Sequence, residues 1–264
     1  MIYPEPPKLK TGIVGKDDPT ARIANVSLYL HEPYSISPHT YNPAVWQWYD
    51  TIYTWNSKIY YQFFNRFRMR LTGIQGMVKN TFTGHVPFSS KLGVCTICKM
   101  YTTEKEFNIV HMKQDYLNYI SGKVKNCGAF GAVKYCHDDV YKGDIKNADG
   151  TLKPSSNEKL RVLARYKYCL AFESCMHDYW AWDWVTEKIY DCFLAKCMPI
   201  FLGAPNIKEK IPKELYISMR DYVGLDELIY TLDNMSELEY NTTTEMAYQY
   251  YHDVYDPRVP ELDA

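Results

Sequence analysis

The stretch FESCMHDYWAWDWVTEK, residues 172–188, brings together side chains that suit a phosphorylated nucleotide. Thr186, Glu187 and Lys188 have the pattern of the first turn of a helix, whose free N–H groups and positive dipole end attract phosphate. Lys188 adds a formal positive charge, and Glu187 has oxygens that could accept hydrogen bonds from ribose hydroxyls. Three of the six tryptophans stand between residues 180 and 184, where their rings could form a flat wall for a base or a sugar. Together these residues predict a site for a nucleotide that carries a pyrophosphate and a sugar.

A purely structural interpretation explains the same stretch equally well. The charged pair would then be solvated helix surface, and the tryptophans would belong to the core. Trp180 and Trp182 alternate with Ala181 and Asp183, however, so the rings cannot all face inward on a regular element. A loop with several partly exposed rings is typical of a binding surface. The sequence leaves both interpretations open.

The elements that must position these residues follow an alternating pattern. Short apolar or aromatic runs alternate with helical patterns, which indicates an α/β fold with two Rossmann-like halves. Val185, Ile189 and Phe193 fall on one helix face, as packing on a sheet requires. Ligands of parallel α/β sheets bind beyond the carboxyl ends of the strands, which is where residues 172–188 lie. We expect strands at 26–30, 50–55, 91–101, 166–172, 198–203 and 215–219, and helices at 57–71, 107–122, 185–197 and 225–235.

The composition changes in the middle of the chain. The segment GDIKNADGTLKPSSNEK, residues 143–159, is rich in Gly, Asn, Asp, Ser and Pro and is typical of a loop or interdomain connection. We therefore expect one domain at 1–135, a second at 136–250 and a tail at 251–264.

The second half carries motifs of a known family. RYKYCLAFES, followed by WVTEKIYDCFLAKCMPIFLGAPN and IPKELYISMRDY, resembles the C-terminal donor-binding domain of the α-(1,3)-fucosyltransferases. That family has a strand ending in Phe-Glu-Asn, a short loop, Tyr-x-Thr-Glu-Lys opening a helix, and a strand ending near Pro-x-x-x-Gly. The likeness runs from about Arg165 to Tyr222 and more faintly to Tyr251. It implies a GT-B-like fold with a donor-binding second domain and an acceptor-side first domain facing it across a crevice. It also implies a nucleotide-sugar donor, a glycan acceptor and inversion at the anomeric carbon.

The resemblance assigns roles to the opening stretch. Lys188 would hold the donor pyrophosphate and Glu187 the ribose, with Thr186 and Glu173 in the same donor-binding motifs. Trp184 would occupy the place of the family's nucleotide-contacting tyrosine.

Two departures from the family concern the donor. Ser174 stands where the family has asparagine, and a tryptophan stands where it has tyrosine, so the identity of the donor stays open. The chain also resembles the small fucosyltransferase-like enzymes of large chlorella viruses that decorate capsid glycans, which implies UDP-xylose as an alternative to GDP-fucose. A second basic residue for the phosphates would be Lys134 or Arg161, with Arg165 as a further candidate.

An inverting transferase also needs a carboxylate that takes the proton of the acceptor hydroxyl. The sequence LYLHEP places Glu32 at the end of an expected strand, on the crevice side, and it is our candidate base, with Asp50 in reserve. A loop carboxylate that merely faces water is the alternative for Glu32. We expect the acceptor sugar to lie against HEPYSISPHTY, in contact with His31, Tyr34 and His39.

Composition narrows the partners. A net charge of −1 gives no reason to expect nucleic acid, and no apolar run reaches the length of a membrane span. The first residues lack the hydrophobic core of a signal peptide and the eight cysteines read as reduced thiols, so we expect a cytoplasmic protein, in the host cytoplasm if it is viral. We expect no cofactor and no metal, since no Asp-x-Asp element is present and Cys95 and Cys98 fall on opposite faces of a strand. A homodimer would supply acceptor surface that the short first half lacks, and a catalytically inactive carbohydrate- or nucleotide-binding protein on the same fold is the alternative function.

Overall fold

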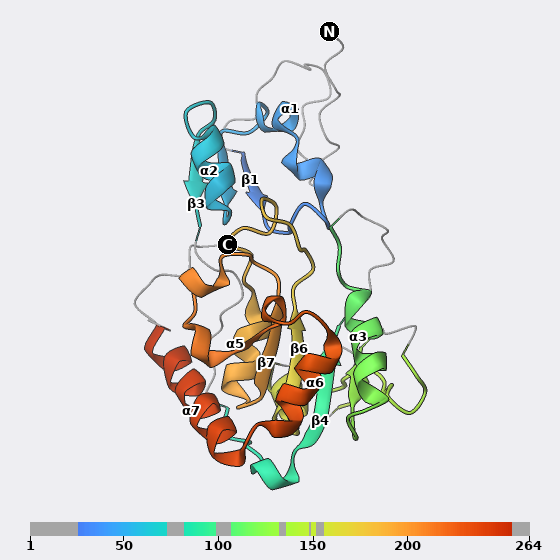
Figure 1. Cartoon of the computed structure of the whole chain (residues 1–264). Helices are drawn as coiled ribbons and strands as arrows, with labels where there is room; N and C mark the ends of the chain where they lie inside the picture. The colour runs from blue at the N-terminus through green and yellow to red at the C-terminus, as the bar shows by residue number, and fades with distance from the viewer. Residues whose placement is uncertain are drawn as a thin grey trace.

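Two parallel β-sheets organise the molecule (Figure 1). The computed structural model describes residues 26–72, 82–98, 107–131, 136–147, 149–151 and 156–254. The smaller sheet has the strand order β1-β2-β3 and the larger one β5-β4-β6-β7-β8. The strands are β1 (Ser27–Leu30), β2 (Thr51–Thr54), β3 (Met69–Leu71), β4 (Leu92–Ile97), β5 (Gly128–Phe130), β6 (Tyr166–Phe172), β7 (Met198–Leu202) and β8 (Ile217–Ser218). The α-helices are α1 (Pro43–Trp46), α2 (Ser57–Phe63), α3 (Met112–Ser121), α4 (Ser156–Ala164), α5 (Glu187–Leu194), α6 (Leu225–Asn234) and α7 (Glu237–Val254).

The smaller sheet packs its apolar face on α2 and on the end of α1. Leu30, Ile52 and Met69 contribute one residue from each strand, and Trp46 and Ile59 cover them. Each of these five side chains is at least nine-tenths buried, so this unit has a small core of its own.

The expected helix over residues 57–71 is correct only in its first half. Asn56 caps α2 by accepting the Ile59 N–H at 3.1 Å, and the helix ends at Phe63. Residues 69–71 instead form β3, because their backbone finds hydrogen-bonding partners in β2 and Met69 joins the buried face. Tertiary pairing here outweighs the local helical pattern.

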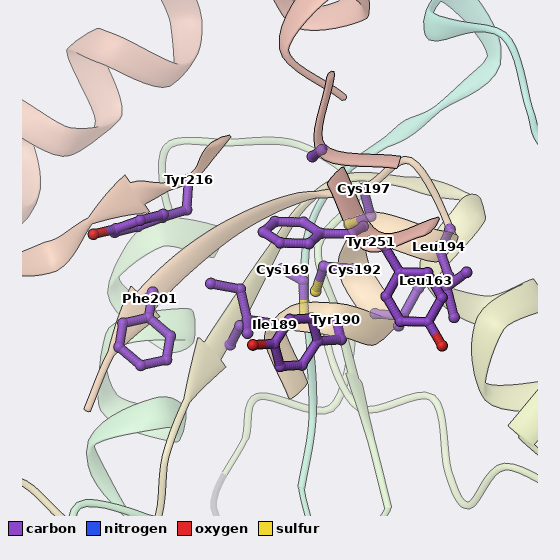
Figure 2. Close-up of a cluster of buried hydrophobic side chains, with 14 of the residues drawn as sticks. Leu163, Cys169, Ile189, Tyr190, Cys192, Leu194, Cys197, Phe201, Tyr216 and Tyr251 are labelled. Atoms are coloured by element: carbon purple, nitrogen blue, oxygen red, sulfur yellow. The ribbon is translucent and has the colours of Figure 1, made fainter. Parts of the chain in front are cut away.

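The larger sheet is covered on both faces. Helices α4, α5 and α7 supply residues to one apolar cluster and α3 and α6 to the other. Figure 2 shows the first cluster, in which Ile189 and Tyr190 of α5 lie beside Cys169 of β6. Every residue of β6 except Lys167 is buried, as expected of a central strand in a parallel sheet. The expected strands 166–172 and 198–203 and the helices at α5 and α6 are confirmed.

The expected domain boundary at residue 135 does not coincide with the division between the sheets. Strands β4 and β5 precede that residue but belong to the larger sheet, where β4 pairs directly with β6. The division therefore falls between β3 and β4. The expected tail boundary at residue 251 is also displaced, because α7 continues to Val254 and buries Tyr251 in the core.

Cys95 and Cys98 contact opposite sides of the larger sheet. Cys95 belongs to the cluster under α5 and Cys98 to the cluster under α3, as the spacing in a strand predicts. Within the described ranges, no helix combines the length and apolar character that crossing a bilayer requires.

Candidate active site

The larger sheet has a switch in topology between its two central strands. From β4 the chain proceeds to β5 on one side, and from β6 it proceeds to β7 and β8 on the other. Helices α3 and α5 begin after β4 and β6, so both helix N-termini lie at the carboxyl edge of neighbouring strands. Ligands of open α/β sheets bind at such a crevice.

A fully buried carboxylate fixes the start of α5. Glu173 directly follows β6 and is 0% exposed. Its Oε1 accepts the backbone N–H of Thr186 at 2.8 Å, and its Oε2 accepts Lys188 Nζ at 2.9 Å. The Thr186 hydroxyl lies 2.9 Å from both oxygens and accepts Lys188 Nζ at 2.9 Å. Glu173 therefore orients the turn and, being fully buried, does not itself face a donor.

Lys188 keeps part of its side chain open to solvent. Its side chain is 25% exposed, whereas its partner carboxylate is enclosed. Burial alone would lower the pKa of Lys188, but attraction to Glu173 and Glu187 outweighs burial and raises it. The raised pKa favours the charged ammonium form, which lies at the positive end of the α5 dipole.

Glu187 belongs to a wider network of charges. Its Oε1 lies 3.7 Å from Lys159 Nζ and 3.9 Å from Lys188 Nζ, and its side chain is 40% exposed. Burial would raise the pKa of Glu187, but the two ammonium groups outweigh it and lower the pKa. Lys159 is anchored by Asp191 Oδ2 at 2.5 Å. Glu187 is thus an ionised, accessible acceptor beside Lys188, and its contact with a ribose stays a prediction.

The sequence analysis missed Lys113, a buried cation close to this network. Lys113 lies in the first turn of α3 and is 2% exposed. Burial and repulsion from Lys188 together lower its pKa to about 8, although Cys98 and Glu173 act in the opposite direction. No hydrogen bond or ion pair to Lys113 is found in the part of the chain that the structure describes. A buried ammonium with this surplus of positive charge favours an anion at the site. Only the sheet order, which puts the N-termini of α3 and α5 at the carboxyl edge of neighbouring strands, reveals it.

The tryptophan loop forms the seam between the two sheet units. The ring of Trp180 stacks on Tyr34 at 4.5 Å between centroids, and Trp184 contacts Trp55 at 4.6 Å. Lys58 Nζ lies 3.6 Å from the centroid of the Trp182 ring. All three tryptophans therefore contact residues of the smaller unit. This combines the two interpretations of the sequence, because the rings are packed but lie in an interface between units.

Asp183 links the two units through hydrogen bonds and an ion pair. Its Oδ2 accepts the Ser57 N–H at 3.0 Å and the Ser57 hydroxyl at 2.5 Å. Its Oδ1 accepts Asn206 Nδ2 at 2.9 Å and lies 2.7 Å from Lys210 Nζ. Burial would raise the pKa of Asp183, but the bonds from Lys210, Ser57 and Asn206 lower it. Asp183 has φ +64°, and aspartate tolerates this left-handed conformation better than most residues.

The candidate base lies near the same seam. Glu32 lies two residues after the end of β1, at the carboxyl edge of the smaller sheet, and is exposed. Its backbone carbonyl accepts the Tyr41 hydroxyl at 2.7 Å. Three residues later, the buried Ser35 hydroxyl donates to the carbonyl of Ser174 at 3.1 Å. The segment after Glu32 is therefore tied to the chain directly after Glu173.

Asp50 does not fit the role of reserve base. Its Oδ2 accepts the Val26 N–H at 3.2 Å, and its own N–H donates to the Val26 carbonyl at 2.9 Å. Both residues precede their strands, so Asp50 lies at the amino edge of the sheet, opposite to Glu32. In this position it supports the start of β1.

The acceptor-side residues are only partly brought together. Tyr34 stacks in the seam, His31 is exposed and stacks on Tyr29 with centroids 5.3 Å apart, and His39 is exposed on the turn before Tyr41. Of the basic residues expected beside Lys188, Arg165 directly precedes β6 and so lies at the amino edge of the larger sheet. Arg161 pairs with Glu158 on the exposed side of α4, and Lys134 lies outside the described residues.

Comparisons with known proteins confirm the resemblance. Residues 132–261 match the model of the family described as Glycosyltransferase family 10 (fucosyltransferase) C-term. The chain is 38% identical over 74 residues to a putative fucosyltransferase-like protein of Arabidopsis thaliana, covering 28% of this chain and 13% of the relative. It is 28% identical over 151 residues to human 4-galactosyl-N-acetylglucosaminide 3-alpha-L-fucosyltransferase 9, covering 56% and 34%. The chain thus spans about a third or less of the length of these curated relatives. The likeness to viral xylosyltransferases stays a prediction.

A solved structure confirms the fold class. The GT-B glycosyltransferase TarM superposes with a TM-score of 0.53 at 7% identity, over 80% of this chain and 42% of TarM. At this identity the likeness concerns the fold. The chain has the expected α/β, GT-B-like architecture.

Proposed function

We propose that this fucosyltransferase-like chain transfers a sugar from a nucleotide-sugar donor to a hydroxyl group of a glycan. The observation that carries the proposal is the paired start of α3 and α5 at the topological switch point, where Lys113 and Lys188 lie beside one buried carboxylate. Two cations and a helix N-terminus suit a diphosphate, which carries several negative charges.

The donor would bind with its diphosphate over the start of α5. Lys188 reaches solvent and would contact the phosphate oxygens, while Glu173 and Thr186 hold its side chain in place. Glu187 would accept hydrogen bonds from the ribose hydroxyls. Lys113 would contribute a second positive charge, and its pKa would rise when the anion binds because the ammonium form then gains a partner.

The reaction would be a single displacement. The acceptor oxygen attacks the anomeric carbon and transfers its proton to Glu32, while the bond between the anomeric carbon and the diphosphate oxygen breaks. The electron pair leaves with the diphosphate, whose charge Lys188, Lys113 and the α5 N-terminus stabilise. Attack opposite to the leaving group inverts the anomeric carbon. The link from Ser35 to Ser174 supports this role for Glu32, because it holds the candidate base beside the donor unit.

GDP-fucose is the first choice of donor. The curated relatives described above are named as fucosyltransferases or fucosyltransferase-like, which favours fucose over xylose. Ser174 and Trp184 differ from the family's asparagine and tyrosine, and UDP-xylose is therefore the second donor to test.

Thermal shift with GDP-fucose, UDP-xylose, UDP-glucose, UDP-galactose and GDP-mannose tests the proposal. A donor at 100 times its dissociation constant stabilises the fold by about 2.7 kcal/mol. We expect one sugar nucleotide to give this shift, Lys188→Ala to abolish it, and Lys123→Ala to retain it, since Lys123 pairs with Asp226 on the surface. No shift with any donor would contradict the proposal.

Turnover separates an enzyme from an inactive binding protein. Release of GDP from GDP-fucose would be followed with a galactosyl-N-acetylglucosaminide, the substrate in the human relative's name, and with a panel of other glycans. Donor binding without turnover on any acceptor would indicate a binding protein on the same fold.

A further inference from the structure

Two buried indole N–H groups in the seam have no hydrogen-bond partner among the residues that the structure describes. The Nε1 atoms of Trp55 and Trp184 are both enclosed, and within the described ranges neither forms a hydrogen bond. Trp55 is 5% exposed and Trp184 is 6% exposed. Buried indole N–H groups ordinarily find a partner, because an unpaired buried donor loses its bond to water without compensation.

The two indoles belong to one cluster between the sheet units. Their ring centroids are 4.6 Å apart, and Cys175 and Ala181 complete the cluster, with Phe107 packed against it. The side chains of these three neighbours have no oxygen or nitrogen atom, so none of them can accept a hydrogen bond. The described side chains of this cluster therefore supply no acceptor, and an oxygen atom of water or of a ligand would satisfy the two N–H groups.

Residues of the cluster are neighbours in sequence of the candidate site residues in both units. Trp55 directly follows β2, at the same carboxyl edge of the smaller sheet as Glu32. Trp184 is two residues before Thr186, and Cys175 is two residues after Glu173. The two unpartnered N–H groups thus come from the two facing units. They lie near the place where the nucleotide sugar and the acceptor glycan would meet.

We propose that Trp55 and Trp184 form the subsite for the transferred sugar and that the Trp55 N–H donates a hydrogen bond to one of its hydroxyl oxygens. The inference rests on the proposed function. Trp55 belongs to the acceptor-side unit, and the part of the donor that reaches this unit is the sugar, because the acceptor attacks there. An indole offers a donor and an apolar face, which suits the hydroxyl groups and C–H surface of a pyranose ring. Trp55 is then a residue that sets sugar specificity and is supplied by the unit opposite the nucleotide.

Titration calorimetry of Trp55→Phe tests this assignment. Phenylalanine keeps an aromatic ring but removes the N–H. We expect GDP to bind as to the wild type and GDP-fucose to bind about five- to tenfold more weakly, the loss of one hydrogen bond. UDP and UDP-xylose would be compared in the same way. Trp182→Phe is the matched control from the same loop, because its ring lies under Lys58 outside this cluster, and it should bind both ligands as the wild type does.

The comparison of the two ligands excludes a merely structural role. Phenylalanine is smaller than tryptophan, so Trp55→Phe leaves a cavity in a buried cluster and should lower the melting temperature of the free protein whether or not the N–H contacts a ligand. A structural defect would weaken the binding of GDP and GDP-fucose alike, whereas the loss of a sugar contact weakens the binding of GDP-fucose alone. Trp184→Phe provides a second variant should Trp55→Phe fail to fold, and we expect the same selective loss of sugar binding.

The outcomes separate this inference from the proposed function. Equal affinities of Trp55→Phe and wild type for GDP-fucose would overturn the inference and leave the transferase proposal intact, as would an equal loss for GDP and GDP-fucose. A wild-type protein that binds none of these nucleotide sugars would overturn both.

Discussion

The carboxyl edges of the two sheets each carry a glutamate, one buried and hydrogen-bonded and the other exposed. At the larger sheet, Glu173 is fully buried and holds Thr186 and Lys188 in one arrangement. At the smaller sheet, Glu32 is exposed, and its carboxylate has no hydrogen bond or ion pair within the described chain. Under the proposed function, the edge of the larger sheet would present fixed charges to the diphosphate of the donor. The edge of the smaller sheet would leave Glu32 free to meet a hydroxyl group and take its proton. Fixed electrostatic groups and a proton acceptor need different surroundings, which matches the difference between the two edges.

Glu32→Gln gives the sharpest test of this contrast and the largest expected effect. The amide keeps the shape but cannot take the proton, so we expect kcat to fall about 10²- to 10⁴-fold. The exposed carboxylate stabilises nothing in the described chain, so the melting temperature and the affinity for the donor should not change. Steady-state kinetics and thermal unfolding check both expectations. Asp50→Asn is the control for kcat, since Asp50 lies at the opposite edge of the sheet. A Glu32→Gln enzyme with wild-type kcat would break the comparison.

Glu173→Gln, in contrast to Glu32→Gln, should act mainly by lowering the stability of the fold. The substitution leaves the Lys188 ammonium without its counter-ion and weakens the bond to the Thr186 N–H. We expect the free energy of unfolding to fall by about 3 kcal/mol. Urea denaturation measures this loss, and donor affinity should fall with it because Lys188 is no longer oriented. Glu245→Gln, which removes the surface partner of Lys196, should cost less than about 1 kcal/mol. Equal costs for the two variants would mean that the buried position of Glu173 is unimportant.

Lys113→Met should give the smallest effect, and it should raise the free energy of unfolding instead of lowering it. Replacing a buried, unpaired ammonium by an apolar chain of similar length should stabilise the free protein by about 1–3 kcal/mol at pH 7 and weaken donor binding. The folded pKa of about 8 lies below the ordinary value of 10.5. Between these values the unfolded chain binds more protons than the folded one, so wild-type stability rises with pH.

The advantage of Lys113→Met should therefore be complete below pH 8 and shrink as the pH rises from about 8 toward 10.5. Urea denaturation of both proteins at several pH values measures it. A pH-independent difference would show that Lys113 carries no perturbed charge and would remove it from the donor site.

Local sequence was enough to predict the parts in which neighbours along the chain decide the structure. The continuous apolar run of β6 and the spacing of Val185, Ile189 and Phe193 predicted a buried strand followed by a helix packed on it. The Thr-Glu-Lys turn predicted where that helix begins. Each of these features depends on periodicity and on residues a few positions apart, which a sequence displays directly.

Residues distant in sequence decided the rest. Residues 57–71 have an apolar pattern that suits one helix, but pairing with β2 turned the second part into a strand. Asp50 reads as a candidate base until β1 and β2 align in parallel and put it at the amino edge. The role of Glu173 as the anchor of Lys188 could not be inferred either, because fifteen residues separate them and only the return of the chain to the same sheet edge brings them within 2.9 Å.

The sequence alone determined the α/β class, the buried second-half strands and the charged turn at the start of α5, since these follow from composition and short-range periodicity. Only the tertiary structure decided that β4 joins the larger sheet, that Lys113 lies close enough to Lys188 to feel its charge and that the tryptophan loop packs against the smaller unit. These outcomes depend on strand order and on contacts between the two units, such as the bond from Ser57 to Asp183 across 126 residues. The physical reason is that hydrogen-bond pairing between strands and burial between units are long-range choices, which no local pattern specifies.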